Sequence, residues 1–252
     1  MTRQARPAHV FPGGCLPRVS KPGEWFPTLK EAGIEVIPRS EWRGLIASGI
    51  GLRRHVPKIF DQDGMGSCAT ESSTQAVQVV REFQGQPFVR LNPWFVYYHT
   101  KVGGGGSNID TNLRFMQEKG VAPYAVWPRS KRLSRPSSEA YEAAKNFRID
   151  EVYDITNRDE FASALLYGFP VVYGRRGHSI LAVEMLDDDK FIYANSWGNW
   201  GDNGFGKDGL QRDVYRSYGI WALRTVVECE RCDPDWITDR GAPEDNRPGA
   251  AE

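Results

Sequence analysis

Residues 61–83 read DQDGMGSCATESSTQAVQVVREF, a glycine-containing loop that leads into a helical pattern. From Cys68 onward, small and apolar residues recur at the 3.6-residue spacing of one helix face, and Gly85 and Pro87 end the pattern. The sequence therefore predicts a helix whose first turn carries Cys68. A thiol at a helix N-terminus lies in the positive field that favours its reactive thiolate form.

Helical patterns precede strand patterns along the rest of the chain. We expect further helices in residues 94–101, 109–120, 137–147 and 158–166. We expect strands in residues 170–173, 178–185, 191–195 and 220–227, where β-branched and aromatic residues lie between turn signals. Helices first and strands later indicate an α+β protein with two segregated halves.

The two ends of the chain differ in composition from its middle. Residues 1–34 are rich in Pro, Gly and basic residues, which favours an extended arm with at most one short helix near residues 28–32. Such an arm is either a disordered tail or a segment that docks on the domain or on a partner. We expect one folded domain over residues 35–228 and an acidic C-terminal tail over residues 229–252.

Composition bounds the class of protein. The 252 residues are 40% hydrophobic and 12% aromatic, which is enough to bury a sizeable core. Lys plus Arg and Asp plus Glu both number 32, so no chain-wide basic field favours nucleic acid or an anionic membrane surface as a partner. We find no apolar signal-peptide segment and no apolar run that could cross a membrane, and we therefore expect a cytoplasmic protein.

The cysteine count is low. Four cysteines stand at positions 15, 68, 229 and 232, too few for a disulfide scaffold in a chain of this length. Cys229 and Cys232 form a C-x-x-C pair that fits a tail disulfide or two free thiols better than half of a zinc site, because no second Cys or His pair lies nearby. We expect no metal and no organic cofactor.

Four residues far apart in sequence could serve one thiol chemistry. The Cys68 thiolate would be the nucleophile, His178 after Gly177 would act as base and acid, and Asn195 would hold the imidazole. The side-chain amide of Gln62 and the Cys68 backbone N–H would stabilise a developing oxyanion. Taken singly, Cys68 could be a buried core residue, His178 a structural strand residue, Asn195 a turn residue and Gln62 a solvated loop residue.

The chain resembles the papain family of cysteine peptidases over residues 37–227. The resemblance rests on five runs that occur in the family's order, namely IPRSEWRG (37–44), VPKIFDQDGMGSCA (56–69), GGGGSNIDTNLRFMQEKGV (103–121), GHSILAV (177–183) and NSWGNWGDNGF (195–205). It implies a helical half and a β-barrel-like half with the active cleft between them. It also implies the roles just given for Cys68, His178, Asn195 and Gln62.

The resemblance further implies a substrate-binding surface. Trp197 would shield the Asn–His hydrogen bond from water, and the backbones of Gly105 and Gly106 would pair antiparallel with an extended substrate. A plain flexible hinge is the alternative for the glycine run. Gly66, Ser67 and Gly177 are further candidates for substrate contact because they flank the nucleophile and the histidine.

Some features depart from the family pattern. Met65 stands where secreted members usually have a disulfide cysteine, and Ala69 replaces the usual aromatic residue after the nucleophile. The residues before Ile37 are too few to resemble the family's usual inhibitory prodomain. The chain therefore resembles a compact, bacterial or phage-like member without the usual disulfides.

The main functional prediction is a cysteine peptidase that cleaves a peptide or protein substrate through a thioester on Cys68. One alternative is a structural or binding component of a large assembly such as a virion, active or inactive, whose N- and C-terminal arms hold an assembly partner. Another is a hydrolase or transferase that acts on isopeptide or peptidoglycan amides.

Overall fold

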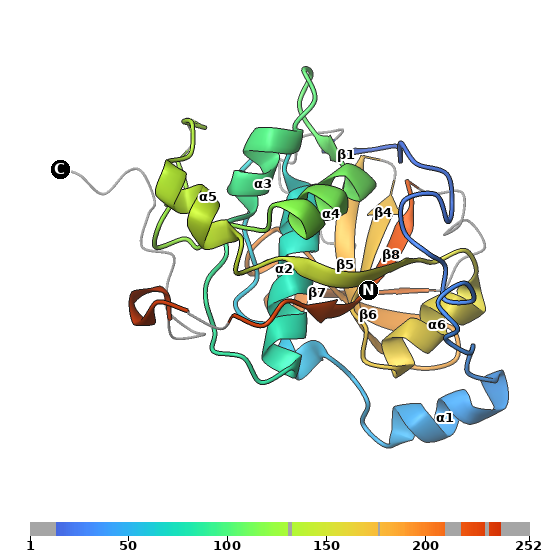
Figure 1. Ribbon diagram of the computed structural model, residues 1–252. Coiled ribbons are helices and arrows are strands. Elements are labelled where there is room, and N and C mark those ends of the chain that lie inside the picture. The colour runs from blue at the N-terminus through green and yellow to red at the C-terminus, as the bar shows by residue number, and fades with distance from the viewer. Residues whose placement is uncertain (1–13, 131–132, 176, 210–217, 230–231, 238–252) are drawn as a thin grey trace.

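The computed structural model describes residues 14–130, 133–175, 177–209, 218–229 and 232–237 (Figure 1). The helices are α1 (Arg39–Ala47), α2 (Cys68–Phe83), α3 (Pro93–Thr100), α4 (Ile109–Glu118), α5 (Ser138–Ala144), α6 (Arg158–Leu166) and α7 (Trp200–Asn203). The strands are β1 (Cys15–Leu16), β2 (Ser107–Asn108), β3 (Ile149–Asp154), β4 (Val171–Arg175), β5 (His178–Met185), β6 (Lys190–Ala194), β7 (Phe205–Gly209) and β8 (Ile220–Val226). This arrangement confirms the predicted α+β class.

A six-stranded antiparallel sheet forms one half of the molecule, in the order β3-β8-β4-β5-β6-β7. Its two faces pack into two separate apolar cores because successive strand residues point to opposite sides. In β5, Leu181 and Val183 join the core around α2, whereas Ile180 and Ala182 join a second core with Phe161 of α6. The sheet is thus covered on one side by α2 and on the other by α6.

Helix α2 is the central element of the fold (Figure 1). Its residues 68–81 are all buried, and it packs against α3 and α4 on one side and β5 and β8 on the other. The helix begins at Cys68, as the sequence predicts. Helices α3 and α6 each begin after an asparagine whose side chain accepts a backbone N–H, Asn92 from Trp94 and Asn157 from Glu160.

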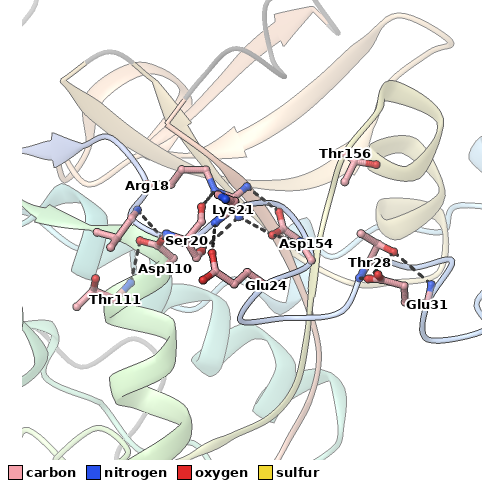
Figure 2. Close-up of polar contacts among 12 residues, drawn as sticks. Arg18, Ser20, Lys21, Glu24, Thr28, Glu31, Asp110, Thr111, Asp154 and Thr156 are labelled. Carbon is pink, nitrogen blue, oxygen red and sulfur yellow. Dashed lines mark hydrogen bonds and ion pairs between the residues drawn. The ribbon is translucent and has the colours of Figure 1, made fainter.

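The N-terminal segment packs on the domain over residues 14–34 (Figure 2), an arrangement that fits the docking alternative for this part. Figure 1 shows it running from β1 to α1. Leu29 is 0% exposed and packs in the second core together with Ile37 and Trp42. The short helix expected near residues 28–32 is only a hydrogen-bonded turn, closed by the Ala32 N–H on the Thr28 carbonyl at 3.0 Å. Residues 1–13 lie outside the described part.

Near the other end, Cys229 and Cys232 form a disulfide. The following 3-10 turn, Pro234–Trp236, packs its tryptophan ring 6.0 Å from that of Phe147. Of the expected acidic tail, residues 238–252 lie outside the described part, and the domain boundaries at 34 and 229 stay predictions.

Candidate active site

Cys68 lies at the first position of α2 and faces the start of β5. The backbone N–H groups of Ser179 and Ala69 act on its thiol and lower its pKa. The hydroxyls of Ser72, one turn along α2, and Ser179 also hydrogen-bond at 2.7 Å. The N-terminus of α2 and the first residues of β5 therefore meet at the thiol.

His178 and Asn195 are brought together by the pairing of β5 with β6. The imidazole Nε2 and the Asn195 Oδ1 are 2.8 Å apart. Asn195 is buried, and the Trp197 ring stacks on His178 with centroids 4.7 Å apart and an interplanar angle of 27°. Because Asn195 holds Nε2, any proton transfer by this imidazole would use Nδ1.

Gln62 is tied to the Asn195 loop through Ser196. The Gln62 backbone N–H donates to the Ser196 carbonyl at 2.9 Å, and the Ser196 hydroxyl donates to Gln62 Oε1 at 2.7 Å. Gln62 Nε2 donates to the Met65 carbonyl at 2.7 Å. An amide nitrogen carries two hydrogens, so a second N–H remains for an oxyanion.

The predicted substrate-binding residues lie in the loops around the thiol. Ser67 is the N-cap of α2 and Gly66 precedes it, whereas Gly177 enters β5 with φ of 75°. Gly105 and Gly106 adopt φ of 91° and 82° and close a turn, in which the Gly106 carbonyl accepts from Val102. Their backbone groups therefore close the turn. The strand edge that pairs with another segment belongs to β2, which follows.

That edge is already occupied by the chain's own N-terminal segment. β1 pairs with β2 in parallel, with Cys15 opposite Ser107, and the Ser107 N–H donates to the Gly14 carbonyl at 3.1 Å. A Cβ placed on Gly14 would lie 2.7 Å from Cys68 Sγ and 3.2 Å from the Gly66 carbonyl oxygen. The segment therefore covers the nucleophile, and its direction is opposite to that implied for a substrate.

Burial beneath the N-terminal segment keeps the Cys68 thiol protonated. Cys68 is 1% exposed, and this burial raises the pKa of its thiol to about 12. The negative charge of Glu71 raises the pKa further, while the backbone N–H bonds from Ser179 and Ala69 oppose the rise. In the closed structure, Cys68 is a neutral thiol at pH 7.

A buried ion pair beneath the nucleophile loop was missed by sequence reasoning. Glu71 Oε1 accepts from Ser67 Oγ at 2.9 Å, from Trp94 Nε1 at 3.0 Å and from Arg129 Nη2 at 3.3 Å. The side chains of Glu71 and Arg129 are only 0% and 8% exposed. The signal was available, because a glutamate on the apolar face of α2 requires a partner. The pair positions Ser67, the residue before Cys68.

Within the described residues, no cluster of His, Cys, Asp or Glu is arranged to hold a metal ion. The same part of the chain contains no helix with the length and apolar character needed to cross a membrane.

No protein-family model and no curated protein matches the sequence. Solved structures do match the fold. Xylellain, a cysteine protease from Xylella fastidiosa, aligns over 89% of this chain and 100% of its own, with a TM-score of 0.67 and 21% identity. Digestive procathepsin L2 proteinase from Tenebrio molitor larval midgut aligns over 87% and 79%, with a TM-score of 0.63 and 15% identity.

A third neighbour carries an inhibitor. The Carica candamarcensis cysteine protease CMS1MS2 in complex with E-64 aligns over 74% of this chain and 96% of its own, with a TM-score of 0.53 and 19% identity. All three neighbours are cysteine proteases by their descriptions, and the likeness of this chain to them is one of fold. The chain has the papain-like cysteine protease fold.

Proposed function

We propose that this protein is a cysteine peptidase that uses Cys68 as nucleophile and His178 as general base and acid. The observation that carries the proposal is the 2.8 Å contact between His178 Nε2 and Asn195 Oδ1, together with the backbone of the next residue, Ser179, acting on the Cys68 thiol at a helix N-terminus. The contact fixes the ring orientation and leaves Nδ1 for proton transfer. Thiol nucleophiles in hydrolases need this pairing of a base and a third orienting group.

The reaction would proceed in two halves. The Cys68 thiolate attacks the peptide carbonyl, and the oxyanion receives hydrogen bonds from the Cys68 backbone N–H and the second Nε2 hydrogen of Gln62. His178 then protonates the leaving amine, which departs and leaves a thioester. Water, deprotonated by His178, hydrolyses the thioester and restores the thiol.

The test is a peptide-library digest followed by mass spectrometry, with the full chain, the Cys68→Ser variant and the Cys15→Ser variant as matched control. We expect cleavage by the parent and by Cys15→Ser, and none by Cys68→Ser, because a serine hydroxyl is not ionised by this environment. Full retention of cleavage by Cys68→Ser would refute the proposal. Isopeptide and peptidoglycan amides in the same digest test the second chemistry.

The covered thiol favours one other role, a papain-fold component of a large assembly that does not turn over substrate. Reaction with an epoxide-type thiol inhibitor separates the two. Covalent modification at Cys68, located by peptide mapping, supports the peptidase. No modification after prolonged incubation supports the structural role.

A further inference from the structure

We propose that Cys229 and Cys232 form a thiol–disulfide exchange site, in which the buried guanidinium of Arg81 stabilises the Cys232 thiolate that a dithiol reductant releases. The inference goes beyond the proposed peptidase function, because it concerns a second pair of sulfur atoms and does not involve Cys68. The sequence left a tail disulfide and two free thiols as alternatives for this pair, and the structure has the disulfide.

The disulfide lies where a reductant can reach it. Cys229 and Cys232 are both partly exposed and pack against the edge of the apolar core around α2. By contrast, Cys15 and Cys68 are each 1% exposed. Thiol–disulfide exchange requires that an attacking thiolate approach a sulfur atom. Of the four cysteines, the pair in the disulfide is therefore the one open to a reductant in solution.

A buried cation, Arg81 in the last turn of α2, lies against the disulfide. The residue is only 2% exposed, and its Nη2 donates to Cys232 Sγ at 3.9 Å. Its other hydrogen-bond acceptors are neutral, because Nη1 donates to Gln86 Oε1 at 2.6 Å and Nη2 to the Pro87 carbonyl at 3.2 Å. The Phe147 ring centroid lies 4.6 Å from the guanidinium carbon.

This cation has no counter-charge in the described part of the chain. No carboxylate there forms an ion pair with it, and its Nε has no hydrogen-bond partner. Burial lowers the pKa of the guanidinium to about 10. Proteins seldom bury an arginine without an anion, because desolvation of the charge is costly. Among the groups that contact Arg81, Cys232 is the one that can become an anion.

A second buried arginine shows how this fold treats such a charge when a carboxylate is present. Arg129 has a side chain that is 8% exposed and lies over the Trp94 ring at 4.0 Å, much as Arg81 lies over Phe147. Arg129, however, pairs with the carboxylate of Glu71 at 3.3 Å. Reduction of the disulfide would give Arg81 the anion that Glu71 gives to Arg129.

Other charges close to the pair in sequence are exposed. Glu228, Asp233 and Asp235 lie on the same segment, and each is exposed to solvent. Water and salt screen such charges, so they oppose a thiolate less than a buried guanidinium in contact with the sulfur favours it. The contact with Arg81 is made by Cys232. Of the two sulfur atoms, we therefore expect Cys232 Sγ to carry the negative charge.

The exchange balances with a dithiol as the reductant. One thiolate of the dithiol attacks Cys229 Sγ, the disulfide bond breaks, and Cys232 leaves as a thiolate beside Arg81. The second thiolate of the dithiol then attacks the reductant sulfur of the mixed disulfide, and Cys229 departs and takes up a proton. The dithiol loses two electrons and two protons and becomes a disulfide. The protein gains both electrons and one proton, and the second proton goes to solvent.

The first experiment measures the reduction equilibrium of the full chain in mixtures of reduced and oxidised dithiothreitol. After an acid quench and alkylation, trypsin cleavage after Arg231 places Cys229 and Cys232 in separate peptides. Arg81→Met removes the cation and keeps a long side chain. We expect it to lower the equilibrium constant for reduction about tenfold near pH 9, which is about 30 mV for this two-electron couple. Equal constants for parent and variant would overturn the proposal.

The ratio between the two constants should depend on pH. We expect the guanidinium to lower the pKa of the thiol formed at Cys232 on reduction. Its effect is therefore present above that pKa and is lost as pH falls, since below it the thiol is protonated in both proteins. Near pH 6 the ratio should approach one. A ratio that does not change with pH would show that Arg81→Met acts through packing alone, and would refute the thiolate pair.

Matched variants separate charge from shape. Arg81→Lys keeps the positive charge and should stay closer to the parent than Arg81→Met does. Arg114 lies over the Trp25 ring at 4.9 Å and pairs with Glu118 on the surface, so Arg114→Met tests loss of a stacked arginine elsewhere. It should keep the parent's equilibrium constant. An equal shift in Arg114→Met would show a general effect on the fold and would refute a specific role of Arg81.

The second experiment needs no variant that could fail to fold. The parent is treated briefly with reduced glutathione, quenched with acid and mapped with trypsin. A thiol of lower pKa leaves faster, so we expect glutathione mainly on Cys229, with Cys232 as the leaving group. Glutathione mainly on Cys232 would contradict the assigned direction.

Two further arms identify the reductant and separate this inference from the peptidase. Reduction by the protein dithiol thioredoxin at a lower concentration than dithiothreitol requires indicates a protein partner, and the reverse order indicates a small-molecule dithiol. No reduction by either would overturn the proposal. The Cys68→Ser chain should give the same equilibrium and the same mixed disulfide as the parent, so failure of the peptidase proposal leaves the exchange site standing.

Discussion

Cys68 and His178 reach the site by different routes. Cys68 takes its place from local sequence, because the helix that begins at it also buries the residues that follow. His178 is the first residue of β5, and its partner Asn195 follows the last residue of β6, so their contact depends on strand register. One side of the site is thus set by a helix start and the other by long-range pairing.

A register shift between β5 and β6 determines which residues lie beside His178. β5 and β6 pair Glu184 with Ile192 but Ala182 with Tyr193, so one extra residue of β5 is accommodated between these pairs. In this register Leu181 lies opposite Ala194. Continued toward the start of β5, the same register places His178 opposite Trp197, and the two rings stack. A one-residue slip turns every side chain to the other face of a strand. The bulge therefore decides which side chains His178 meets, and bulges are frequent next to active sites.

The largest effect is expected on the sheet side. His178→Ala should lower kcat/KM for a peptide substrate by about 10²–10⁴, the range that a positioned acid and base supplies. Asn195→Ala should cost less, because the imidazole remains and loses only its orienting partner. Both are measured in the Gly14→Ala background, where the added Cβ cannot stay 2.7 Å from Cys68 Sγ and the N-terminal segment must shift. Equal losses for the two variants would mean that His178 depends wholly on Asn195.

Substitutions beside α2 should change the free energy of unfolding more than the rate of peptide cleavage. Arg129→Met leaves Glu71 buried without its cation and should lower the free energy of unfolding by about 3–5 kcal/mol in urea titrations. Arg39→Ala breaks the exposed pair with Asp159 and should change it by at most about 1 kcal/mol. Adding Glu71→Gln to Arg129→Met should recover most of the loss. A loss below that of Arg39→Ala would contradict the buried-pair interpretation.

The same contrast explains what sequence could predict. The start of α2 and the strands β4, β5, β6 and β8 follow from local spacing, and the structure has them close to their expected bounds. β3 was not predicted, because three of the six residues in its sequence IDEVYD are acidic and do not alternate with apolar ones, and it becomes a strand by pairing with β8. The structure brings His178 to Asn195, whereas the resemblance to known peptidases supplied their roles.

The N-terminal segment over Cys68 shows which contacts local sequence patterns do not reveal. Nothing near Gly14 in sequence indicates that it must be glycine, because the atom it would strike belongs to Cys68 on another element. Likewise, Arg18 looks like one more basic residue of a polar arm until Asp154 is placed against it. Contacts of this kind join segments far apart in sequence and leave no periodic signal.

Burial of Cys68 beneath the N-terminal segment also predicts how its alkylation depends on pH. Burial beneath the segment, here called the closed state, raises the pKa of the thiol to about 12, and exposure to water returns it toward the ordinary value of roughly 8.5. The closed state thus holds its proton more tightly, so closing is favoured at low pH and weakens as pH rises between these values. We expect alkylation of the parent to keep rising through this range, whereas alkylation of Gly14→Ala levels off earlier. Superimposable pH profiles would contradict this coupling.

The smallest effect should come from the hydrogen bond that joins the two sides directly. Ser72 on α2 and Ser179 on β5 share a buried contact of 2.7 Å, one turn from Cys68 and one residue from His178. Ser72→Ala leaves the Ser179 hydroxyl without this partner and should lower the free energy of unfolding by about 1–3 kcal/mol. Replacing both serines by alanine should restore part of it, because the Ser179 hydroxyl, otherwise left with only the Tyr173 carbonyl at 3.4 Å, is then removed as well. If the helix side and the sheet side were held independently of this bond, Ser72→Ala would leave kcat/KM in the Gly14→Ala background unchanged. A fall in kcat/KM that the double replacement does not rescue would show that the bond sets the distance between thiol and imidazole.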